Sequence, residues 1–442
     1  MSFPRYESYK ESGVEWLGDV PEYWELKRLK RNLRLLTEKT DRRENPVALE
    51  NIESWSGSFI QTETKFEGDG IAFERGDILF GKLRPYLAKV YLADASGEAV
   101  GDFHVMRPTK GIDSRFSQYQ ILNREFIAIV DGSTFGAKMP RVSWDFLGNM
   151  VLTTPPIPEQ QTIAAFLDRE TAKIDALIAE QQRLIELLKE KRQSVISHAV
   201  TKGLNPNAPM KDSGIEWLGD VPEHWEISRL GFESWVRARL GWKGLKAEEY
   251  VDDGFAFLST PNIKGASIDF ENVNFINEYR YDESPEIKLR VDDVLLAKDG
   301  STLGIVNIVR SLPRPTTVNS SIAVITPNQS LNGIFLYYLF QSSYMENTIQ
   351  RIKGGMGVPH LFQGDLNKFY IPLPTIDEQR TIAVFLDSET VKLDTLITEA
   401  KTAITLLQER RTALISAAVT GKIDVRGLVS AKTEVKAETV PC

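Results

Sequence analysis

Cysteine is almost absent from the sequence: of its 442 residues only the last, Cys442, is one. No intramolecular disulfide can form, and a metal cluster built on cysteine is excluded. The sequence also lacks an apolar run of about 18 residues, the length that a membrane-spanning helix needs. Its N-terminus, MSFPRYESYKESG, has no apolar region of the kind found in signal peptides. These absences predict a cytoplasmic protein that does not enter a membrane.

Catalytic motifs are missing as well. Residues 298–304 (KDGSTLG) contain glycine but lack the spacing and lysine of a phosphate-binding P-loop, and no glycine-rich loop with a downstream acid matches a dinucleotide or methyl-donor site. The four histidines, His104, His198, His224 and His360, do not have the spacing of metal ligands. We therefore expect a non-catalytic chain with no metal and no cofactor of its own. Scattered carboxylates leave an unknown hydrolase as an alternative.

An excess of positive charge is also absent. The formal net charge is −8, whereas proteins that bind nucleic acid are more often basic. Net charge governs non-specific attraction, but a local basic cleft can bind phosphate on an acidic molecule. The charge therefore weakens an assignment to nucleic-acid binding without excluding it. With 42% hydrophobic residues, the chain can fill the cores of several domains, and its length predicts roughly two to four of them.

The most informative feature is an internal duplication. SGVEWLGDVPEYWE at residues 12–25 returns as SGIEWLGDVPEHWE at residues 213–226, and EQQTIAAFLDRETAKIDALI at 159–178 returns as EQRTIAVFLDSETVKLDTLI at 378–397. The first pair is offset by 201 residues and the second by 219, so the material between the shared blocks is 18 residues longer in the second copy. That material is nearly unrelated between the copies. A repeated framework with two divergent inserts is typical of a protein that recognises two different things at a fixed separation.

Each copy is predicted to contain a strand-rich globular part followed by one long helix. Short runs rich in Ile, Val and Leu, bounded by Gly, Asp or Pro, predict strands at Gly76–Phe80, Leu87–Leu92, Val291–Leu296 and Gly304–Val309. Helical patterns lie at about residues 117–130 and 333–352. The proline-rich segments TTPPIPEQ and IPLPTIDEQ end the globular parts, because proline removes a donor and restricts its neighbour. A long helix follows each.

Both long helices carry a heptad pattern with apolar residues at positions a and d. With Ile163 at a, the first stripe is predicted to contain Ile163, Leu167, Ile174, Leu177, Leu184, Leu188 and Val195. The same register in the second helix predicts Ile382, Leu386, Leu393, Leu396, Ala400, Ala403, Leu407, Leu414 and Ala417. The a positions are interrupted by Glu170, Lys191, Glu389 and Arg410. About 40 residues at about 1.5 Å each make a rod of about 60 Å.

Two arrangements could bury these stripes. Each helix could pack separately on its own domain, or the two helices could pair with each other. Antiparallel pairing buries both stripes at once, whereas neither helix has a globular neighbour long enough to cover it. Each helix ends near a glycine that suits a left-handed cap, Gly203 or Gly421. Since the first helix leads through Gly203 into the second tryptophan block, the second helix should end close to the first block, which predicts a pseudo-two-fold, circularly closed molecule.

Together these residues resemble the specificity subunit of type I restriction-modification enzymes. The resemblance covers nearly the full chain. It rests on the duplicated W-L-G-x-[VI]-P-x-x-W-E block, the P-x-x-E-Q-x-x-I-A-x-F-L-D entry into each long helix, the A-V-T-x-G-like helix ends, and two unlike domains between them. It implies an α+β fold with two mixed α/β target recognition domains, each of which recognises one half of a bipartite, asymmetric double-stranded DNA site.

The resemblance also implies partners. The two long antiparallel coiled-coil helices would set the spacing of the half-sites and bind two methyltransferase (M) subunits, and motor-nuclease (R) subunits would join the complex. S-adenosylmethionine, ATP and Mg are expected on those partner subunits. The family's amino-methyltransferase motif, Asn or Asp followed by Pro-Pro and an aromatic, is absent here, because Pro155 and Pro156 follow Thr154 and lead into Ile157.

The expected domain boundaries follow the repeats. They are 1–157 for the first target recognition domain, 158–204 for the first long helix, 205–376 for the second target recognition domain, 377–424 for the second long helix, and 425–442 for a disordered tail. Physical reasoning supports recognition of a two-part site. The two half-sites lie at a constant distance and helical phase, at about 3.4 Å per base pair, so a rigid spacer between the two domains is needed. Divergent domains fit an asymmetric target, because two identical ones related by a two-fold axis would recognise a palindrome.

Candidate DNA-binding residues lie in polar loops that combine glycine with basic or aromatic residues. In the first insert they come from GKLRPY (81–86) and STFGAKMPRVSW (133–144), and in the second from KDGSTLG (298–304), TVNSS (317–321) and RIKGGMGVPH (351–360). The candidates are Lys82, Arg84, Lys138, Arg141, Lys298, Ser301, Thr302, Asn319, Lys353 and His360. The alternative is that many are ordinary loop residues, with glycines serving turns. A non-enzymatic coiled-coil scaffold with peptide-binding inserts is the alternative function, supported by the lack of a strongly basic insert.

Overall fold

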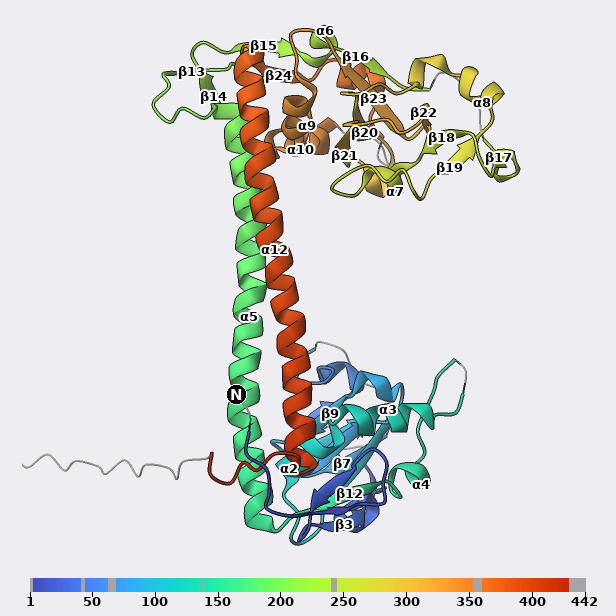
Figure 1. Cartoon of the computed structure of the whole chain (residues 1–442), viewed down its shortest axis with the longest axis vertical. Coiled ribbons are helices and arrows are strands. Elements are labelled where there is room, and N and C mark those ends of the chain that lie inside the picture. Colours follow the sequence, from blue (N-terminus) through green and yellow to red (C-terminus); the bar gives the residue numbers. More distant parts are fainter. Residues whose placement is uncertain are drawn as a thin grey trace, which may run out of the picture. The chain divides into compact units, whose positions relative to one another are not determined.

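The chain divides into two compact units. One contains residues 1–182 and 402–442, and the other contains residues 183–401 (Figure 1). The computed structural model describes residues 3–40, 44–62, 69–136, 138–239, 245–352 and 360–428. Two long helices, α5 (Ile157–Lys202) and α12 (Ile376–Val419), contribute residues to both units, which confirms the predicted helix pair and mixed α/β architecture. In the described ranges, no helix is long and apolar enough to span a membrane.

The first unit contains a mixed α/β domain. Its antiparallel four-stranded sheet has the order β4 (Leu33–Leu36), β11 (Phe103–Pro108), β8 (Ile78–Gly81), β9 (Val90–Leu92). A second sheet has the order β5 (Lys39–Thr40), β7 (Gly70–Phe73), β10 (Gly97–Val100), β6 (Pro46–Val47), with β10 and β6 parallel. Two-stranded pairs are β1 (Tyr9–Glu11) with β2 (Asp19–Pro21), and β3 (Glu25–Arg28) with β12 (Val151–Thr154). The short helices are α1 (Leu29–Asn32), α2 (Ser114–Ile121), α3 (Arg124–Gly132) and α4 (Trp144–Leu147).

The second unit contains a corresponding domain. Its antiparallel sheet has the order β16 (Ser234–Arg237), β23 (Ile322–Pro327), β20 (Val294–Ala297), β21 (Val306–Ile308). The other sheet has the order β17 (Tyr250–Val251), β19 (Asn274–Ile276), β18 (Phe255–Leu258), β22 (Thr316–Val318), with β18 and β22 parallel. The two-stranded pairs are β13 (Met210–Asp212) with β14 (Asp220–Pro222), and β15 (Glu226–Arg229) with β24 (Tyr370–Leu373). The helices are α6 (Leu230–Glu233), α7 (Thr260–Ile263), α8 (Glu278–Asp282), α9 (Gly333–Gln341), α10 (Ser343–Ile352) and α11 (Gln363–Leu366).

The antiparallel sheets of the two domains therefore have the same topology, although the inserts differ in sequence. The order β4-β11-β8-β9 corresponds to β16-β23-β20-β21. The register also agrees, because Phe103 faces Gly81 in the first sheet and Ile322 faces Ala297 in the second. All four predicted strands overlap with observed ones. Each predicted helical segment is two helices, and in the first unit the Asn123 side chain accepts from the backbone of Glu125 at 2.8 Å and so starts the second one.

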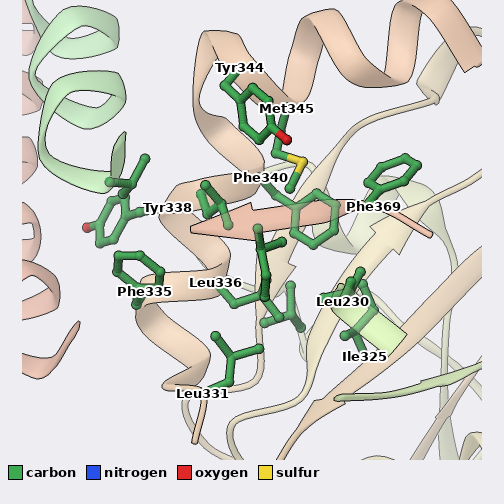
Figure 2. Close-up of a cluster of buried hydrophobic side chains, with 14 of the residues drawn as sticks. Leu230, Ile325, Leu331, Phe335, Leu336, Tyr338, Phe340, Tyr344, Met345 and Phe369 are labelled. Carbon is green, nitrogen blue, oxygen red and sulfur yellow. The ribbon is translucent and has the colours of Figure 1, made fainter. Parts of the chain in front are cut away.

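Each domain has a core of apolar side chains between its antiparallel sheet and the helices that follow. In the second unit, Phe335 and Leu336 of α9 are fully buried together with Phe369 and Ile325 (Figure 2). In the first unit, the corresponding core joins residues of β8 and β11 to Phe126 of α3. Full burial of one such side chain contributes about 1.5–3 kcal/mol. The sheet and its helices therefore hold fixed the loops that extend from the strand ends.

The repeated E-Q motif ties the start of each long helix to its domain. Gln160 is buried; its side-chain oxygen accepts from the Asp113 backbone at 2.8 Å, and its amide donates to the Pro155 carbonyl at 2.8 Å. Gln379 makes the equivalent bonds to Asn332 and Pro374, both at 2.8 Å. Buried amides need such partners, because an unpaired one costs about 1–3 kcal/mol. The motif is thus explained by structure.

The F-L-D part of the motif binds a tyrosine of the domain. The Tyr119 hydroxyl donates to Asp168 at 2.7 Å, and the Tyr338 hydroxyl donates to Asp387 at 2.7 Å. Burial raises the pKa of Tyr119 to about 12, which keeps the phenol protonated and able to donate. Both copies of the framework therefore attach their own domain in the same way.

In the first unit, the start of α5 lies beside the end of α12 (Figure 1). Ile163 and Ile174 of α5 share a buried cluster with Leu414 and Val419 of α12. Arg411 Nε donates to Asp175 Oδ1 at 2.9 Å across the pair. The two segments therefore run antiparallel within this unit.

In the second unit, the end of α5 lies beside the start of α12. Ile196 and Val200 share a cluster with Ile382 and Leu386, and Arg192 Nε donates to Asp394 Oδ1 at 3.0 Å. Since Arg192 and Arg411 are 219 residues apart, as are the two aspartates, each unit contains the same inter-helix ion pair. The segments are antiparallel in this unit too.

The predicted heptad register needs a correction. Leu177, Leu184 and Leu396 are 45%, 42% and 47% exposed, so the prediction that they belong to the buried stripe is wrong. The residues that follow them are turned inward instead, with Ile185 at 7% and Ile397 at 8%. In the middle of each helix, the residues that face inward therefore lie one residue after the predicted heptad positions a.

Charged residues give the physical reason for the shift. In the predicted register Lys191 and Arg410 would face the partner helix, but both are exposed. The next residues, Arg192 and Arg411, face inward and each finds an aspartate. The remaining predicted stripe residues are buried or partly buried: Ile163, Leu167, Ile174, Leu188, Val195, Ile382, Leu386, Leu393, Ala400, Ala403, Leu407, Leu414 and Ala417.

Both helix ends are closed by a glycine in the left-handed region. Gly203 and Gly421 each have φ +76°, which side-chain-bearing residues rarely adopt. Around Gly421, residues of the N-terminal segment contact the residues that follow α12: the Tyr9 hydroxyl donates to the Gly421 carbonyl at 3.1 Å and the Asp424 backbone donates to the Pro4 carbonyl at 2.8 Å. Residues 425–428 of the segment expected to be disordered are described, and Val425 is fully buried in this region. Residues 429–442 lie outside the described residues.

Candidate nucleic-acid interface

In the first unit, the two loops predicted to contact DNA lie next to each other. One follows β8 and the other precedes α4. The Val142 backbone donates to the Lys82 carbonyl at 3.1 Å, and the Arg84 backbone donates to the Pro140 carbonyl at 2.9 Å. The sheet therefore brings together segments that are about 60 residues apart in sequence.

A carboxylate that the sequence analysis did not select connects two of the predicted residues. Arg141 donates from Nε and Nη2 to the two Asp102 oxygens at 3.0 and 2.8 Å, and Lys82 Nζ lies 3.7 Å from the same carboxylate. The hydrogen bonds from Arg141 lower the pKa of Asp102 despite its partial burial. Burial lowers the pKa of the neighbouring His104, so this imidazole adds no charge. We call Lys82, Asp102 and Arg141 the Asp102 cluster.

The other two predicted residues of this domain face solvent. Arg84 and Lys138 are exposed, and neither charged group has a hydrogen bond or ion pair with another described residue. Three large apolar side chains on the same two loops, Tyr86, Phe135 and Met139, are exposed as well. Basic groups beside exposed aromatic rings are suited to phosphate contacts and base stacking. This face of the first domain is its candidate nucleic-acid interface.

The second unit has a matching cluster at the matching place. The Lys298 backbone donates to the Ser321 carbonyl at 2.9 Å and accepts at its own carbonyl from Leu361 at 2.9 Å. The Asp299 carboxylate lies 3.6 Å from Lys298 Nζ and is hydrogen-bonded to His360 Nδ1. The structure therefore brings together the predicted residues Lys298 and His360. We call Lys298, Asp299 and His360 the Asp299 cluster.

The remaining predicted residues of this domain do not belong to that cluster. Ser301 and Thr302 belong to a short 3-10 turn, where Ser301 is exposed and the Thr302 hydroxyl donates to the Asp299 carbonyl at 3.0 Å. The Asn319 side chain accepts from the Ser321 backbone at 3.2 Å, so it stabilises a local turn in this structure. Lys353 lies outside the described residues.

Three residues of the interface were missed by the sequence analysis. Asp102 and Asp299 are acidic and were not considered as parts of a DNA-binding surface. Phe362 is exposed, and its ring lies edge-on to His360 with centroids 4.5 Å apart. The signals available were the adjacency of Asp299 to Lys298 and the position of Phe362 two residues after a candidate. For Asp102 the sequence offered none, because its two partners are 20 and 39 residues away.

Comparison with known proteins identifies the family of the chain. The family model described as the type I restriction modification DNA specificity domain matches residues 17–187 and 243–406. The match covers well over half of the chain, so the chain belongs to that family. The MjaVIII specificity subunit of a type I restriction enzyme from Methanocaldococcus jannaschii is 24% identical over 97% of this chain and 99% of its own length. The EcoBI specificity subunit from Escherichia coli is 22% identical over 67% of this chain and 64% of its own length.

Solved structures show the same fold. A chain from a study of complex assembly and conformational transition of the type I R-M system has a TM-score of 0.73 and 18% identity, covering 90% of this chain and 98% of its own length. The HsdS subunit from Thermoanaerobacter tengcongensis has a TM-score of 0.54 and 18% identity, over 91% of this chain and 98% of its own length. The family match favours DNA specificity over the peptide-binding scaffold.

Proposed function

We propose that this chain is the DNA-recognition subunit of a type I restriction-modification complex, and that each globular domain recognises one half of a bipartite, asymmetric site. One observation carries the proposal: the antiparallel sheets of the two domains share a topology and present two basic side chains at the same position, but the side chains differ. Equal placement suits one kind of ligand, and unequal chemistry suits two different base sequences. Lys82, Arg84, Lys138 and Arg141 would contact one half-site. The residues proposed for the other are Lys298, Ser301, Thr302, Asn319, Lys353 and His360.

The long helices would set the distance between the half-sites. Within each unit the helix segments are antiparallel and bury stripes whose residues recur at intervals of three and four, which supports an antiparallel coiled coil. The same Arg–Asp pair in both units supports a pseudo-two-fold relation, and the contacts between the chain ends support circular closure. The exposed faces of the helices would bind two methyltransferase subunits.

The chain would contribute recognition and no chemistry. No group of three or more His, Cys, Asp or Glu suited to hold a metal occurs among the described residues. In this proposal, S-adenosylmethionine, ATP and Mg bind to the methyltransferase and motor-nuclease partners. Binding of the duplex and of these partners would be the whole function of the chain.

Methylome sequencing of a host with and without the gene tests the proposal. We expect loss of N6-methyladenine at one motif that has two specific halves, an unread middle and no two-fold symmetry. Returning the wild-type gene should restore the same motif. A variant in which Arg84, Lys138 and Arg141 are all alanine should not restore it, provided that the protein is present at the wild-type level.

Two results would contradict the proposal. Methylation that is unchanged by deletion would remove the role in a modification complex. A single palindromic motif would remove the assignment of different half-sites to the two domains. Pull-down of the methyltransferase with both the wild-type chain and the triple variant separates loss of DNA recognition from loss of assembly.

A further inference from the structure

The Asp102 and Asp299 clusters occupy equivalent backbone positions. Lys82 directly follows β8 and Lys298 directly follows β20, and these strands correspond in the two sheets. Each lysine donates its backbone N–H to the residue just before the next strand of the sheet, Asp102 or Ser321, at 2.9 Å. The two lysines are therefore held in the same way.

The second basic residue of each cluster is equivalent too. Arg141 directly precedes Val142, which donates to the Lys82 carbonyl, and His360 directly precedes Leu361, which donates to the Lys298 carbonyl. Arg141 and His360 are 219 residues apart, the same offset as the repeated long helices. Each domain thus presents two basic side chains from the same two points of its backbone.

The carboxylate between them does not come from equivalent positions. Asp102 precedes β11, whereas the residue at that place in the second domain is Ser321 and the carboxylate comes from Asp299, next to Lys298. If the duplication alone explained the carboxylate, it would occupy the same position in both copies. The contact recurs although the residue that makes it has changed, so the contact itself is the shared feature.

Resting on the proposed function, we propose that Asp102 and Asp299 are equivalent positioning residues, each fixing the two basic side chains that recognise its own half-site. A carboxylate that lies between two basic side chains and binds both holds them at one spacing and direction. It also reduces the positive charge of the cluster, which weakens attraction to phosphates of any sequence. Both effects raise discrimination between base sequences at the expense of non-specific affinity.

Substituting asparagine keeps the size of the side chain and removes its charge. Binding of the full-length chain is measured to an unmethylated duplex that carries the motif found by methylome sequencing. It is also measured to duplexes in which only one half of that motif is altered. D102N should reduce discrimination at one half about tenfold, a size typical of one bidentate base contact, and leave the other half unchanged. D299N should do the reverse. In both variants, the affinity for unrelated duplex should be higher than in the wild type, because a released cation can contact phosphate. This affinity should also decrease more steeply as the salt concentration increases.

Matched variants separate positioning from folding. E74Q and D253N remove exposed carboxylates that pair with Arg107 and Arg314 elsewhere in the two domains, and neither should change discrimination. The double variant D299N/S321D moves the carboxylate of the second domain to the place where the first domain has it, and should recover most of the lost discrimination. Recovery cannot arise from a variant that fails to fold.

Three outcomes would overturn the inference. They are wild-type discrimination in both asparagine variants, equal loss at both halves in either one, and no recovery in the double variant. A wild-type chain that does not discriminate any motif would instead overturn the proposed function, and the positioning role with it. The two failures are therefore distinguishable in one set of measurements.

Discussion

At the scale of single residues, the most unusual position in the candidate interface is Arg84. Its φ of 50° lies in the left-handed region, as does the φ of 46° at Ala88, four residues on. For a residue other than glycine this costs about 1–2 kcal/mol. The strained turn leaves the Arg84 side chain exposed at the tip of the loop after β8. Backbone strain of this kind clusters at ligand-binding sites, which supports the proposed contact between Arg84 and DNA.

Glycine and alanine at this position should separate strain from binding. R84G and R84A both remove the guanidinium, so both should weaken DNA binding equally and reduce the slope of log K against log salt by about 1. R84G should be more resistant to urea than R84A by about 1 kcal/mol, because glycine adopts positive φ without strain. Fluorescence anisotropy at several salt concentrations and urea titration measure the two effects.

The control is an arginine at the other end of the same strand. Arg75 is exposed in the turn before β8, and R75A should leave DNA binding unchanged. Lower urea resistance of R84G than of R84A would show that the left-handed turn is not strained.

The residue types in these loops were enough to choose their basic residues as candidates. They were not enough to find the carboxylates that bind those residues. Lys82 and Arg141 were candidates because they lie in loops with glycine and aromatic residues. Their common partner Asp102 depends on how β8 and β11 pair, and a single sequence does not give that register. His360 and Asp299 meet for the same reason, through a bridge between distant segments.

At the scale of elements, the long helices were predictable from the sequence, but only some of the residues on their inward faces were. Adjacent apolar residues, such as Leu184 and Ile185, fit two registers equally well when only apolar positions are counted. Charged residues would have decided between them, because the predicted register puts Lys191 in the interface, whereas the observed one puts Arg192 there with an aspartate to bind. The charged residues at the predicted heptad positions a were therefore the signal that the prediction overlooked.

Paired alanine substitutions test the observed register. I185A should lower stability by about 2–4 kcal/mol, since Ile185 is buried and its removal leaves a cavity. L184A should cost less than about 1 kcal/mol, because Leu184 already contacts water. The midpoint of urea unfolding, followed by far-UV circular dichroism, measures both. Equal losses in the two variants would restore the register predicted from sequence.

The two helix ends differ in how tightly their glycines are packed. A Cβ on Gly421 would lie 2.3 Å from Pro21 Cδ, whereas a Cβ on Gly203 would lie 3.3 Å from Trp225. G203A should therefore cost about 1 kcal/mol from the left-handed backbone alone. G421A should cost about 1–3 kcal/mol more, because the proline ring must move. Thermal unfolding compares them, and a G203A chain that unfolds at or below the temperature of G421A would contradict this packing.

At the scale of the whole molecule, the sequence revealed the duplication and concealed the likeness of the inserts. The repeated blocks keep their residues because Gln160 and Gln379 make the same buried bonds. The inserts share the strand order and register of their antiparallel sheets, which many sequences satisfy, so this common topology was not visible in their residues. The net charge of −8 describes the chain as a whole and says nothing of single loops, such as those that contain the candidates Lys82, Arg84, Lys138 and Arg141.

Lengthening both helices tests whether they set the distance between half-sites. Seven residues inserted after Gln182 and seven after Lys401 keep the inward-facing stripe continuous and add about 10 Å to each helix. Methylome sequencing should then show the same two half-sites, separated by about three more base pairs at about 3.4 Å each. An insertion in α5 alone is the control. It shifts one stripe against the other, so we expect loss of methylation and lower urea resistance. An unchanged spacer in the doubly lengthened chain would mean that something other than α5 and α12 fixes the separation.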